Sequence, residues 1–379
     1  MQIQIKQSLT EIDASDWNRI AGDENPFVRY EFLVALEQTG CIGPEFGWLP
    51  QFVTLYDEGN LIGAVPLYLK DNSYGEFVFD WSWAEAYQRA GINYYPKYVS
   101  SIPYTPATGP RILVDSTHAK PKEIRTHLIQ ATLGFAQQMQ VSSLHWLFTN
   151  EADTALLQEQ GLMLRLGCQF HWQNQNYRDF DDYLQHFSAA KRKKIKRERR
   201  RVLEQGIELE VLHGGDMSDT QWHVFHQFYL STFDKKWGYA TLSLDFFKQL
   251  GQTMPDDVVL VFARHEGKDV ACAFNIKGQH TLYGRHWGCN ADYHSLHFEA
   301  CYYQGLDYCI EHGLQYFEPG AQGEHKISRG FLPTATWSAH WIAHPEFNNA
   351  ISAFVRHEQK EMEAYIIEMT GHSPFKQAV

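Results

Sequence analysis

Two distant stretches of the chain repeat one pattern of strand, tight turn and strand. They cover residues 51–68 and 259–276, and each turns at a Glu-Gly pair. Glycine at the tip supplies the positive φ that a tight hairpin requires. Small residues follow both turns at the same offset, Gly63 and Ala64 in one and Ala271 and Cys272 in the other. One hairpin match is a weak signal, but the same order of elements surrounds both copies, which indicates an internal duplication.

Helix and strand signals alternate along the whole chain, which predicts a mixed α/β architecture. Each half is expected to hold helices, a three-stranded meander, a long helix and a further strand. The meander strands are expected at 51–56, 61–70 and 75–80 in the first half and at 258–265, 269–277 and 280–287 in the second. The long helices are expected at 118–139 and 295–312, with strands after them at 142–148 and 314–318.

The composition excludes several classes of protein. Of the 379 residues, 44% are apolar and 15% aromatic, which suits a folded core and not a disordered chain. The longest unbroken apolar run, Val258–Ala263, is far shorter than the ~20 residues that span a bilayer. Met1–Asp13 contains no apolar signal segment, and the six Cys are scattered without a Cys-x-x-Cys pair. These features predict a cytoplasmic protein with reduced thiols.

Positive charge is concentrated in one segment. Lys191–Arg201 holds nine basic residues and one acid, a net charge of +8, so the rest of the chain sums to −20 against a total of −12. A helix is predicted over 179–204, with Gly206 as its cap. Because phosphate suits such a density of bases, Lys193 and Arg197 are candidates for binding a ligand that carries phosphate. RNA, a nucleotide and anionic lipid all stay open as ligands, and the alternative is a helix whose charges are only solvated.

The order of elements in each half resembles the GNAT acyltransferase unit. Two such units in one chain resemble the Fem family, the bacterial aminoacyltransferases that build peptidoglycan cross-bridges. Motifs of the first half look like the FemAB-like group, often described as peptidoglycan biosynthesis/recognition proteins. These motifs are Asn25–Phe27, Gly47–Trp48, Pro66–Lys70, Ser73–Trp81, Tyr94–Lys97, Pro103–Pro106 and Gly109–Arg111. The resemblance covers essentially the whole chain and implies two tandem GNAT-like domains, 1–165 on the acceptor side and 166–379 on the donor side.

The GNAT resemblance also implies a turn whose backbone amides grip the pyrophosphate of coenzyme A. The signature is Gln/Arg-x-x-Gly-x-Gly/Ala, and the best match begins at Arg285 and ends at Asn290. The match is partial, because its last position is Asn. Arg285, His286 and Gly288 are the resulting candidates for binding acyl-CoA, whereas Lys193 and Arg197 would serve aminoacyl-tRNA.

The stretch Glu318–Gly330 is the candidate catalytic segment. It follows the strand predicted at 314–318, and open α/β sheets bind ligands at the carboxyl ends of their strands. Glu318 and His325 could accept a proton from an attacking amine. Lys326 and Arg329 could stabilise an oxyanion or hold an anionic part of the substrate. The alternative is a surface turn with ordinary charges, although Fem-like chains carry a similar Glu-x-Gly…Lys pattern here.

A cluster of aromatic and acidic residues in the first half is the candidate acceptor site. Aromatic faces bind sugar rings and bases, and carboxylates bind hydroxyls or amines. The alternative is a packed aromatic core. The candidate residues are Asp80, Trp81, Trp83, Glu85 and Tyr104.

The sequence predicts no metal site. The pairs His223/His226 and His294/His297 have workable helical spacing, but the chain has no HExxH motif and no Cys-His cluster. It also lacks GxSxG, GxxxxGK[ST] and a GxGxxG after a strand. Serine-hydrolase, P-loop and dinucleotide-binding interpretations are therefore disfavoured.

These observations together predict an acyltransferase or aminoacyltransferase of the Fem type that acts on an amine, with a peptidoglycan precursor as candidate acceptor. Aminoacyl-tRNA and acyl-CoA are the candidate donors, and no resident cofactor is expected. Two alternatives stay open. One is a non-catalytic protein that recognises muropeptide or glycan, and the other is a CoA-dependent N-acetyltransferase of a small amine, which the acidic body of the chain would attract.

Overall fold

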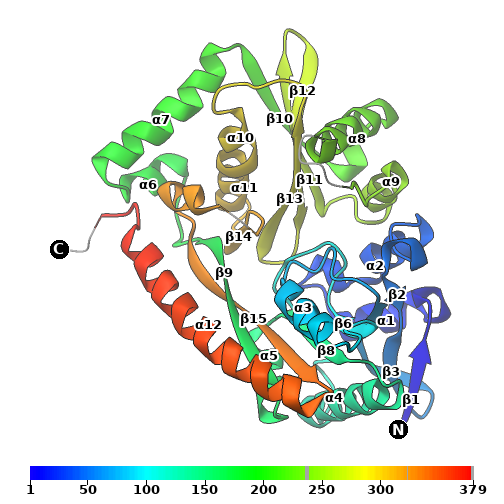
Figure 1. Ribbon diagram of the computed structural model, residues 1–379. Helices are drawn as coiled ribbons and strands as arrows, with labels where there is room; N and C mark the ends of the chain where they lie inside the picture. Colours follow the sequence, from blue (N-terminus) through cyan, green and yellow to red (C-terminus); the bar gives the residue numbers. More distant parts are fainter. Residues whose placement is uncertain (235–238, 322, 377–379) are drawn as a thin grey trace. The chain divides into compact units, whose positions relative to one another are not determined.

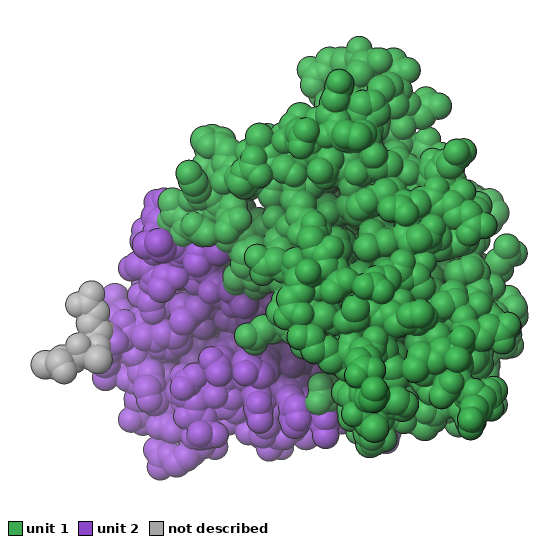
Figure 2. Space-filling view, turned by 90° about the horizontal axis from the view of Figure 1, so that it is seen from below, with its two compact units in different colours: residues 1–168, 335–365 green, residues 169–334, 366–379 purple. Residues whose placement is uncertain are grey.

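The computed structural model describes residues 1–234, 239–321 and 323–376 (Figure 1). The chain divides into two compact units, which Figure 2 colours separately. Unit 1 consists of Met1–Cys168 and Ala335–Tyr365, and unit 2 consists of Gln169–Thr334 together with the residues from Ile366 onward. The first boundary lies close to the expected one at 165/166. The segment 335–365, which the sequence assigned to the second domain, packs with unit 1.

Unit 1 contains two groups of paired strands, in the orders β1-β3-β4-β7 and β2-β5-β6-β8-β15. The strands are β1 Gln2–Lys6, β2 Leu49–Pro50, β3 Phe52–Asp57, β4 Asn60–Val65, β5 Tyr68–Lys70, β6 Lys97–Ser100, β7 Leu113–Val114, β8 Ser143–Thr149 and β15 Leu332–Ile342, whose first residues belong to unit 2. The helices are α1 Ala14–Ala21, α2 Tyr30–Gln38, α3 Trp81–Arg89, α4 Pro121–Gln138 and α5 Glu151–Glu159. The buried face of α4, with Ile124 and Leu128, packs in one core with Val53, Leu55 and Trp146 of the strands.

Unit 2 is built on strands in the order β10-β11-β12-β13-β14-β9. These are β9 Met163–Gln173, which begins in unit 1, β10 Ile207–His213, β11 Val258–His265, β12 Lys268–Lys277, β13 Thr281–Cys289 and β14 Tyr316–Glu318. The helices are α6 Phe180–Gln185, α7 Ala189–Glu204, α8 Asp219–Asp234, α9 Leu244–Thr253, α10 Leu296–Phe298 and α11 Gln304–Glu311, and α12 Pro345–Gly371 begins in unit 1 and ends in unit 2. Helices α8 and α9 cover one face of β10–β13, and α7, α10 and α11 cover the other (Figure 1).

The two repeated hairpins have the same backbone geometry. Glu58 and Gly59 have φ values of 49° and 85°, and Glu266 and Gly267 have 51° and 74°. Two successive positive φ values match the turn that the right-handed twist of paired strands favours. The strand pairing also shifts register directly after Leu55 in one hairpin and after Ala263 in the other, at the same distance before the turn. Turn and bulge are therefore repeated together, as an internal duplication predicts.

The strand predicted at 75–80 is wrong. Residues 71–80 form an irregular segment between β5 and α3, in which Gly75 and Phe77 have φ values of 78° and 60°. The backbone departs from a strand because Glu76 and Asp80 turn inward to the buried ammonium of Lys97. The third strand of the first sheet is instead β7, which pairs with β4.

Two predicted helices are interrupted. The helix expected over 179–204 breaks between α6 and α7, where Phe187 is buried and Ser188 donates its backbone N–H to the carbonyl of Pro374. A docking partner so far along the chain leaves no local signal. The helix expected over 295–312 contains a π-helical turn, Glu299–Tyr303, between α10 and α11. Such turns are rare and concentrate at functional sites.

Candidate functional site

Strands β13 and β14 separate soon after they pair. They run parallel only where Thr281–Tyr283 faces Tyr316–Glu318, and β13 continues to Cys289 while the chain leaves β14 at Pro319. The pairing of β12 with β13 shifts at the same level, so Arg285 is the extra residue of a bulge between Gly284 and His286. A Cβ at Gly284 would lie 3.2 Å from the Cα of Pro319. The 319–330 bend therefore starts against β13, at the carboxyl end of β14.

Glu318, the last residue of β14, lies in a partly buried polar cluster. Its Oε1 is 3.9 Å from Nδ1 of His171 on β9, and the two side chains are only 13% and 11% exposed. Burial, reinforced by the positive charge of Lys326, lowers the pKa of His171 to about 3, so this imidazole is neutral at pH 7. Burial also lowers the pKa of Arg285 to about 10, against the opposing effect of the Glu318 carboxylate. The ionisable side chains of Glu318, His171 and Arg285 thus share this partly buried cluster.

Lys326 is a buried lysine in a short 3-10 helix, Glu324–Arg329, within the bend. Its Nζ donates to the backbone carbonyl of Gly320 at 2.6 Å, and no carboxylate of the described residues forms an ion pair with it. Burial lowers its pKa to about 8, partly offset by the neighbouring Cys301 thiol. At pH 7 the group is still an ammonium ion, with donor capacity left for a ligand.

His325 lies beside Lys326 and is held by aromatic neighbours. Its Nε2 is 2.9 Å from the hydroxyl of Tyr302, which belongs to the π-helical turn. A Cβ on Gly323 would lie 2.4 Å from the imidazole, and Gly323 has a φ of 117°, so glycine is needed there on both counts. Burial and then the charges of Arg329 and Lys326 lower the pKa of His325, which keeps the ring neutral and able to accept a proton.

Both terminal nitrogens of Arg329, a predicted substrate-binding residue, donate to protein groups, whereas its Nε is buried without a hydrogen-bond partner among the described residues. Its Nη2 donates to both carboxylate oxygens of Glu198 at 3.0 Å, its Nη1 donates to the carbonyl of His325 at 2.7 Å, and its guanidinium lies 3.5 Å from the centre of the Phe298 ring. The hydroxyl of Tyr303 donates to the same carboxylate. Arg329 therefore positions the bend against α7, and a role in binding substrate stays a prediction.

The basic helix α7 has two different faces. Ile195, Glu198 and Val202 are buried, and Arg199 pairs with Glu299 and Asp307. The one acid of the basic run is thus the anchor of the helix. Lys193 and Arg197 are exposed and form no ion pair with the described carboxylates.

The residues of the predicted coenzyme A turn lie within strand β13. His286 pairs with Phe274 and Gly288 with Cys272 of β12, so Arg285–Gly288 is not a turn before a helix. A Cβ on Gly288 would lie 2.0 Å from the carbonyl oxygen of Phe228, which shows that this glycine allows α8 to pack on the strand. Burial drives the pKa of His286 well below its usual range. Binding of acyl-CoA by these residues stays a prediction.

The predicted acceptor residues of unit 1 are divided between core and surface. Trp83 is buried in an aromatic core with Tyr87 and Tyr94, as the packed-core alternative expects. Asp80 is 3% exposed and accepts from Lys97 at 2.5 Å and from the hydroxyl of Tyr94 at 2.6 Å.

The remaining acceptor candidates have simpler surroundings. Tyr104 is 9% exposed and donates to the carbonyl of Cys41 at 2.9 Å, whereas Trp81 and Glu85 lie on the surface of α3. Binding of an acceptor by these five residues is not tested by their placement and stays a prediction.

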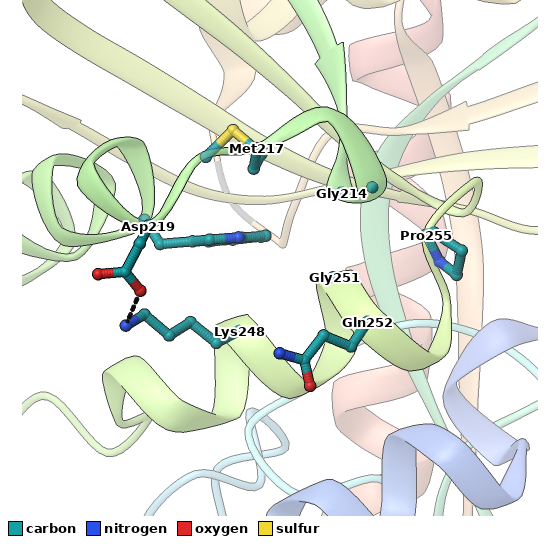
Figure 3. A pocket seen from close by; sticks show the side chains of 9 residues that line it. Gly214, Met217, Asp219, Lys248, Gly251, Gln252 and Pro255 are labelled. Atoms are coloured by element: carbon teal, nitrogen blue, oxygen red, sulfur yellow. Dashed lines mark ion pairs between the residues drawn. The ribbon is translucent and has the colours of Figure 1, made fainter.

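An open hollow of about 420 Å³ lies between α8, α9 and the end of β10 (Figure 3). Trp222 lines the hollow. Asp219 and Lys248, which also line it, pair with each other (Figure 3). The hollow is separate from Glu318 and Lys326, because its lining residues belong to the helices on the opposite face of β10–β13 from α10 and α11 (Figure 1). Its two charged side chains already neutralise one another.

Sequence reasoning missed His171, Glu198 and Tyr302. Each acts through a partner far along the chain: His171 reaches Glu318 through the pairing of β9 with β14, and Glu198 reaches Arg329 across helix packing. The isolated acid in the basic run was a usable signal, since a lone carboxylate among nine bases marks a specific partner. The pairing of β9 with β14 had no local signal.

Neither a metal cluster nor a membrane span is found in the part of the chain that the structure describes. No three His, Cys, Asp or Glu side chains among residues 1–234, 239–321 and 323–376 come together as a metal site. No helix within those ranges combines the length and the apolar character needed to cross a bilayer.

Solved structures of known proteins share this fold. FemX gives a TM-score of 0.54 at 10% identity, covering 93% of this chain and 100% of that chain. The C-terminal domain of a putative lysylphosphatidylglycerol synthetase from Agrobacterium fabrum gives 0.56 at 10% identity, covering 93% and 97%. L-PGS from Bacillus licheniformis gives 0.50 at 11% identity, covering 89% and 98%. At these identities the likeness establishes the fold alone.

The fold is a mixed α/β architecture, as predicted, and it is shared with FemX. None of the curated protein sequences compared with the chain matches it. The FemAB-like family model, described as peptidoglycan biosynthesis/recognition, matches residues 8–377. The chain therefore belongs to the FemAB-like family.

Proposed function

We propose that the chain transfers an aminoacyl or acyl group from an activated ester or thioester to an amine of a peptidoglycan precursor. The observation that carries this proposal is Lys326, a buried ammonium with no carboxylate partner among the described residues, at the point where β13 and β14 separate. Folding does not gain from such a group, so its retention supports a functional role. Membership of the FemAB-like family, described as peptidoglycan biosynthesis/recognition, is the reason for proposing a peptidoglycan precursor as the acceptor.

In the proposed reaction the amine nitrogen attacks the carbonyl carbon of the donor. A C–N bond forms, and the C–O or C–S bond to the carrier then breaks. The proton lost by the amine passes to the neutral imidazole of His325 and from there to the leaving oxygen or sulfur. Glu318 is the second candidate for this proton. The Lys326 ammonium stabilises the negative charge that develops on the carbonyl oxygen.

Aminoacyl-tRNA is the donor that we favour. The exposed face of α7 offers Lys193 and Arg197, which have no ion-pair partner among the residues described, to a phosphate backbone. By contrast, the residues proposed for coenzyme A lie inside β13, and Gly288 has a packing role against α8. Acyl-CoA stays the alternative donor.

A transfer assay with the Lys326→Met variant tests the proposed chemistry. The substrates are aminoacyl-tRNA labelled in its amino acid and a muropeptide that carries a free amine. We expect transfer by the wild-type protein and a loss of at least about 100-fold in kcat on substitution, the size typical of removing one oxyanion donor. Lys248→Met is the matched control, since Lys248 is also in unit 2 but pairs with Asp219 on another face.

The same assay separates the proposal from its rivals. Transfer that survives in Lys326→Met would remove this site from the mechanism. Tight binding of the muropeptide by the wild-type protein without any transfer, from either aminoacyl-tRNA or acetyl-CoA, would favour the non-catalytic recognition protein. Transfer from acetyl-CoA alone would favour the N-acetyltransferase.

A further inference from the structure

In unit 1, the segment between β5 and α3 buries its acidic side chains and exposes its aromatic ones. Its acidic side chains are buried, with Glu76 2% and Asp80 3% exposed. Its aromatic side chains are turned to solvent, and we call these four residues the aromatic rim. They are Tyr74, 70% exposed, Phe77, 41%, Phe79, 54%, and Trp81, 39%. A segment that buries carboxylates and exposes four rings in succession is the opposite of an ordinary surface loop.

Two buried lysines hold the polar groups inward. Nζ of Lys97 donates to Oε2 of Glu76 at 2.8 Å, to Oδ2 of Asp80 at 2.5 Å and to Oγ of Ser73 at 2.8 Å. Nζ of Lys70 lies 3.8 Å from the centre of the Trp48 ring and donates to the backbone carbonyl of Tyr74 at 3.2 Å. Because Lys97 pairs with both carboxylates inside the unit, the segment cannot reverse its orientation without breaking these ion pairs and burying its rings.

The backbone is fixed in the same orientation. Phe77 has a φ of 60°, a conformation that non-glycine residues with bulky side chains rarely adopt. Gly75 has a φ of 78°, and a Cβ there would lie 2.6 Å from the ring of Tyr104. Arg165 donates to the carbonyl of Phe79 at 2.8 Å. Strained backbone that is held by its surroundings indicates a selected geometry, and here that geometry presents Phe77 to solvent.

We propose that the aromatic rim docks the protein on the interfacial region of a lipid bilayer whose headgroups are zwitterionic. Tyr and Trp favour the headgroup level of membranes, and Phe can reach the acyl boundary. No charged side chain is exposed between Tyr74 and Trp81, so the contact itself is uncharged and matches an uncharged hydrocarbon boundary. The net charge of −12 makes an anionic surface unfavourable for the body of the protein.

Other partners fit the rim less well. A sugar needs hydrogen-bonding side chains beside the rings, but Glu76 and Asp80, the polar side chains between Tyr74 and Trp81, are buried with Lys97. A protein interface of this kind would combine aromatic anchors with Met or Arg, and the rim has neither. The proposal does not rest on the transfer reaction, because docking requires neither donor nor acceptor.

Co-sedimentation with phosphatidylcholine vesicles tests the proposal on the full chain. We expect the wild-type protein to bind. The Phe77→Asn, Phe79→Ser double variant should bind at least about tenfold more weakly, since it lacks two rings that the bilayer would bury. Asn tolerates the positive φ of position 77, so the fold is not disturbed. Phe354→Ser is the matched control, because Phe354 is 45% exposed on α12 outside the rim, and we expect it to bind as the wild type does.

Quenching by brominated lipid locates the contact. We expect brominated lipid to quench less tryptophan fluorescence in Trp81→Phe than in the wild-type protein, because the variant lacks the indole of the aromatic rim. Equal binding by the wild-type protein and the double variant, or no binding of the wild type, would overturn the proposal. So would binding that requires phosphatidylglycerol and disappears in Lys193→Glu, Arg197→Glu, since the contact would then be α7. A dimer that the double variant converts to monomers, without vesicle binding, would identify a protein interface instead.

Discussion

Lys326 keeps a positive charge where burial opposes it. Its pKa falls from 10.5 to about 8 because the ammonium is desolvated. One pKa unit corresponds to about 1.4 kcal/mol, so at pH 7 the folded state is destabilised by about 3 kcal/mol through this one group. The hydrogen bond to Gly320 compensates only part of this cost. Active sites commonly retain such groups at the expense of stability.

Replacing Lys326 by Met is therefore expected to stabilise the protein. The predicted gain is about 1–3 kcal/mol in the free energy of unfolding at pH 7, from urea denaturation. The folded pKa is depressed, so the penalty is complete below pH 8 and disappears as the pH rises from 8 to 10.5. The gain should shrink over that range. A variant less stable than the wild type at pH 7 would show that the ammonium contributes to folding and would weaken its functional assignment.

The sequence singles out the catalytic candidates, but it does not show which side chains pair with one another. Glu318 and Lys326 stand out in the sequence because ionisable residues and glycines follow a strand end. Nothing near Arg329 in the sequence shows that it pairs with Glu198, or near Asp80 that it pairs with Lys97. Periodicity reports which residues are buried on one element, whereas an ion pair between elements depends on packing.

Helix α7 divides its charges between structure and solvent. Arg199 and Glu198 connect it to the π-helical turn, α11 and the 319–330 bend. Its opposite face carries Lys193, Arg197 and Arg200. Dipole compensation needs only a few bases in the last turn. The surplus of exposed charge on one face is what remains available for a phosphate backbone.

Charge reversal on that face is expected to weaken tRNA binding. Lys193→Glu with Arg197→Glu should lower the affinity at least about tenfold and make the dependence of log K on log salt shallower by about 1–2, as fewer counterions are released. Lys120→Glu with Lys122→Glu is the control, because these exposed lysines of unit 1 change the net charge equally. Fluorescence anisotropy with labelled tRNA measures the affinity and its salt dependence for both double variants. Equal affinities for the two variants would show that the exposed charges of α7 are only solvated and do not bind tRNA.

Elements were predictable where local signals agree with packing. The second meander follows its predicted strands within two residues, because β11 and β12 are mostly buried and largely apolar and turns separate the strands. The strand expected at 75–80 failed although its central residues, 77–79, favour strands, since Lys97 draws Glu76 and Asp80 inward. Tertiary context overrode propensity there, and that exception led to the aromatic rim.

The two units share a hairpin geometry but carry different chemistry. Each hairpin has two positive φ values at its turn and a register shift at the same distance from it. Unit 1 buries Lys97 with two carboxylates, whereas unit 2 leaves Lys326 without one among the described residues. The duplicated fold was readable from the sequence. The reaction was not, because one fold supports many reactions and the site depends on single residues.

The rate of aminoacyl transfer as a function of pH decides whether the Lys326 ammonium acts on the reacting carbonyl. With the pKa of Lys326 at about 8, the rate at saturating substrates, corrected for uncatalysed hydrolysis, should fall as the pH rises from 7.5 to 9.5. The Lys248→Met control should show the same fall. A rate that stays constant or rises across this range, with comparable transfer by Lys326→Met, would contradict the proposed mechanism.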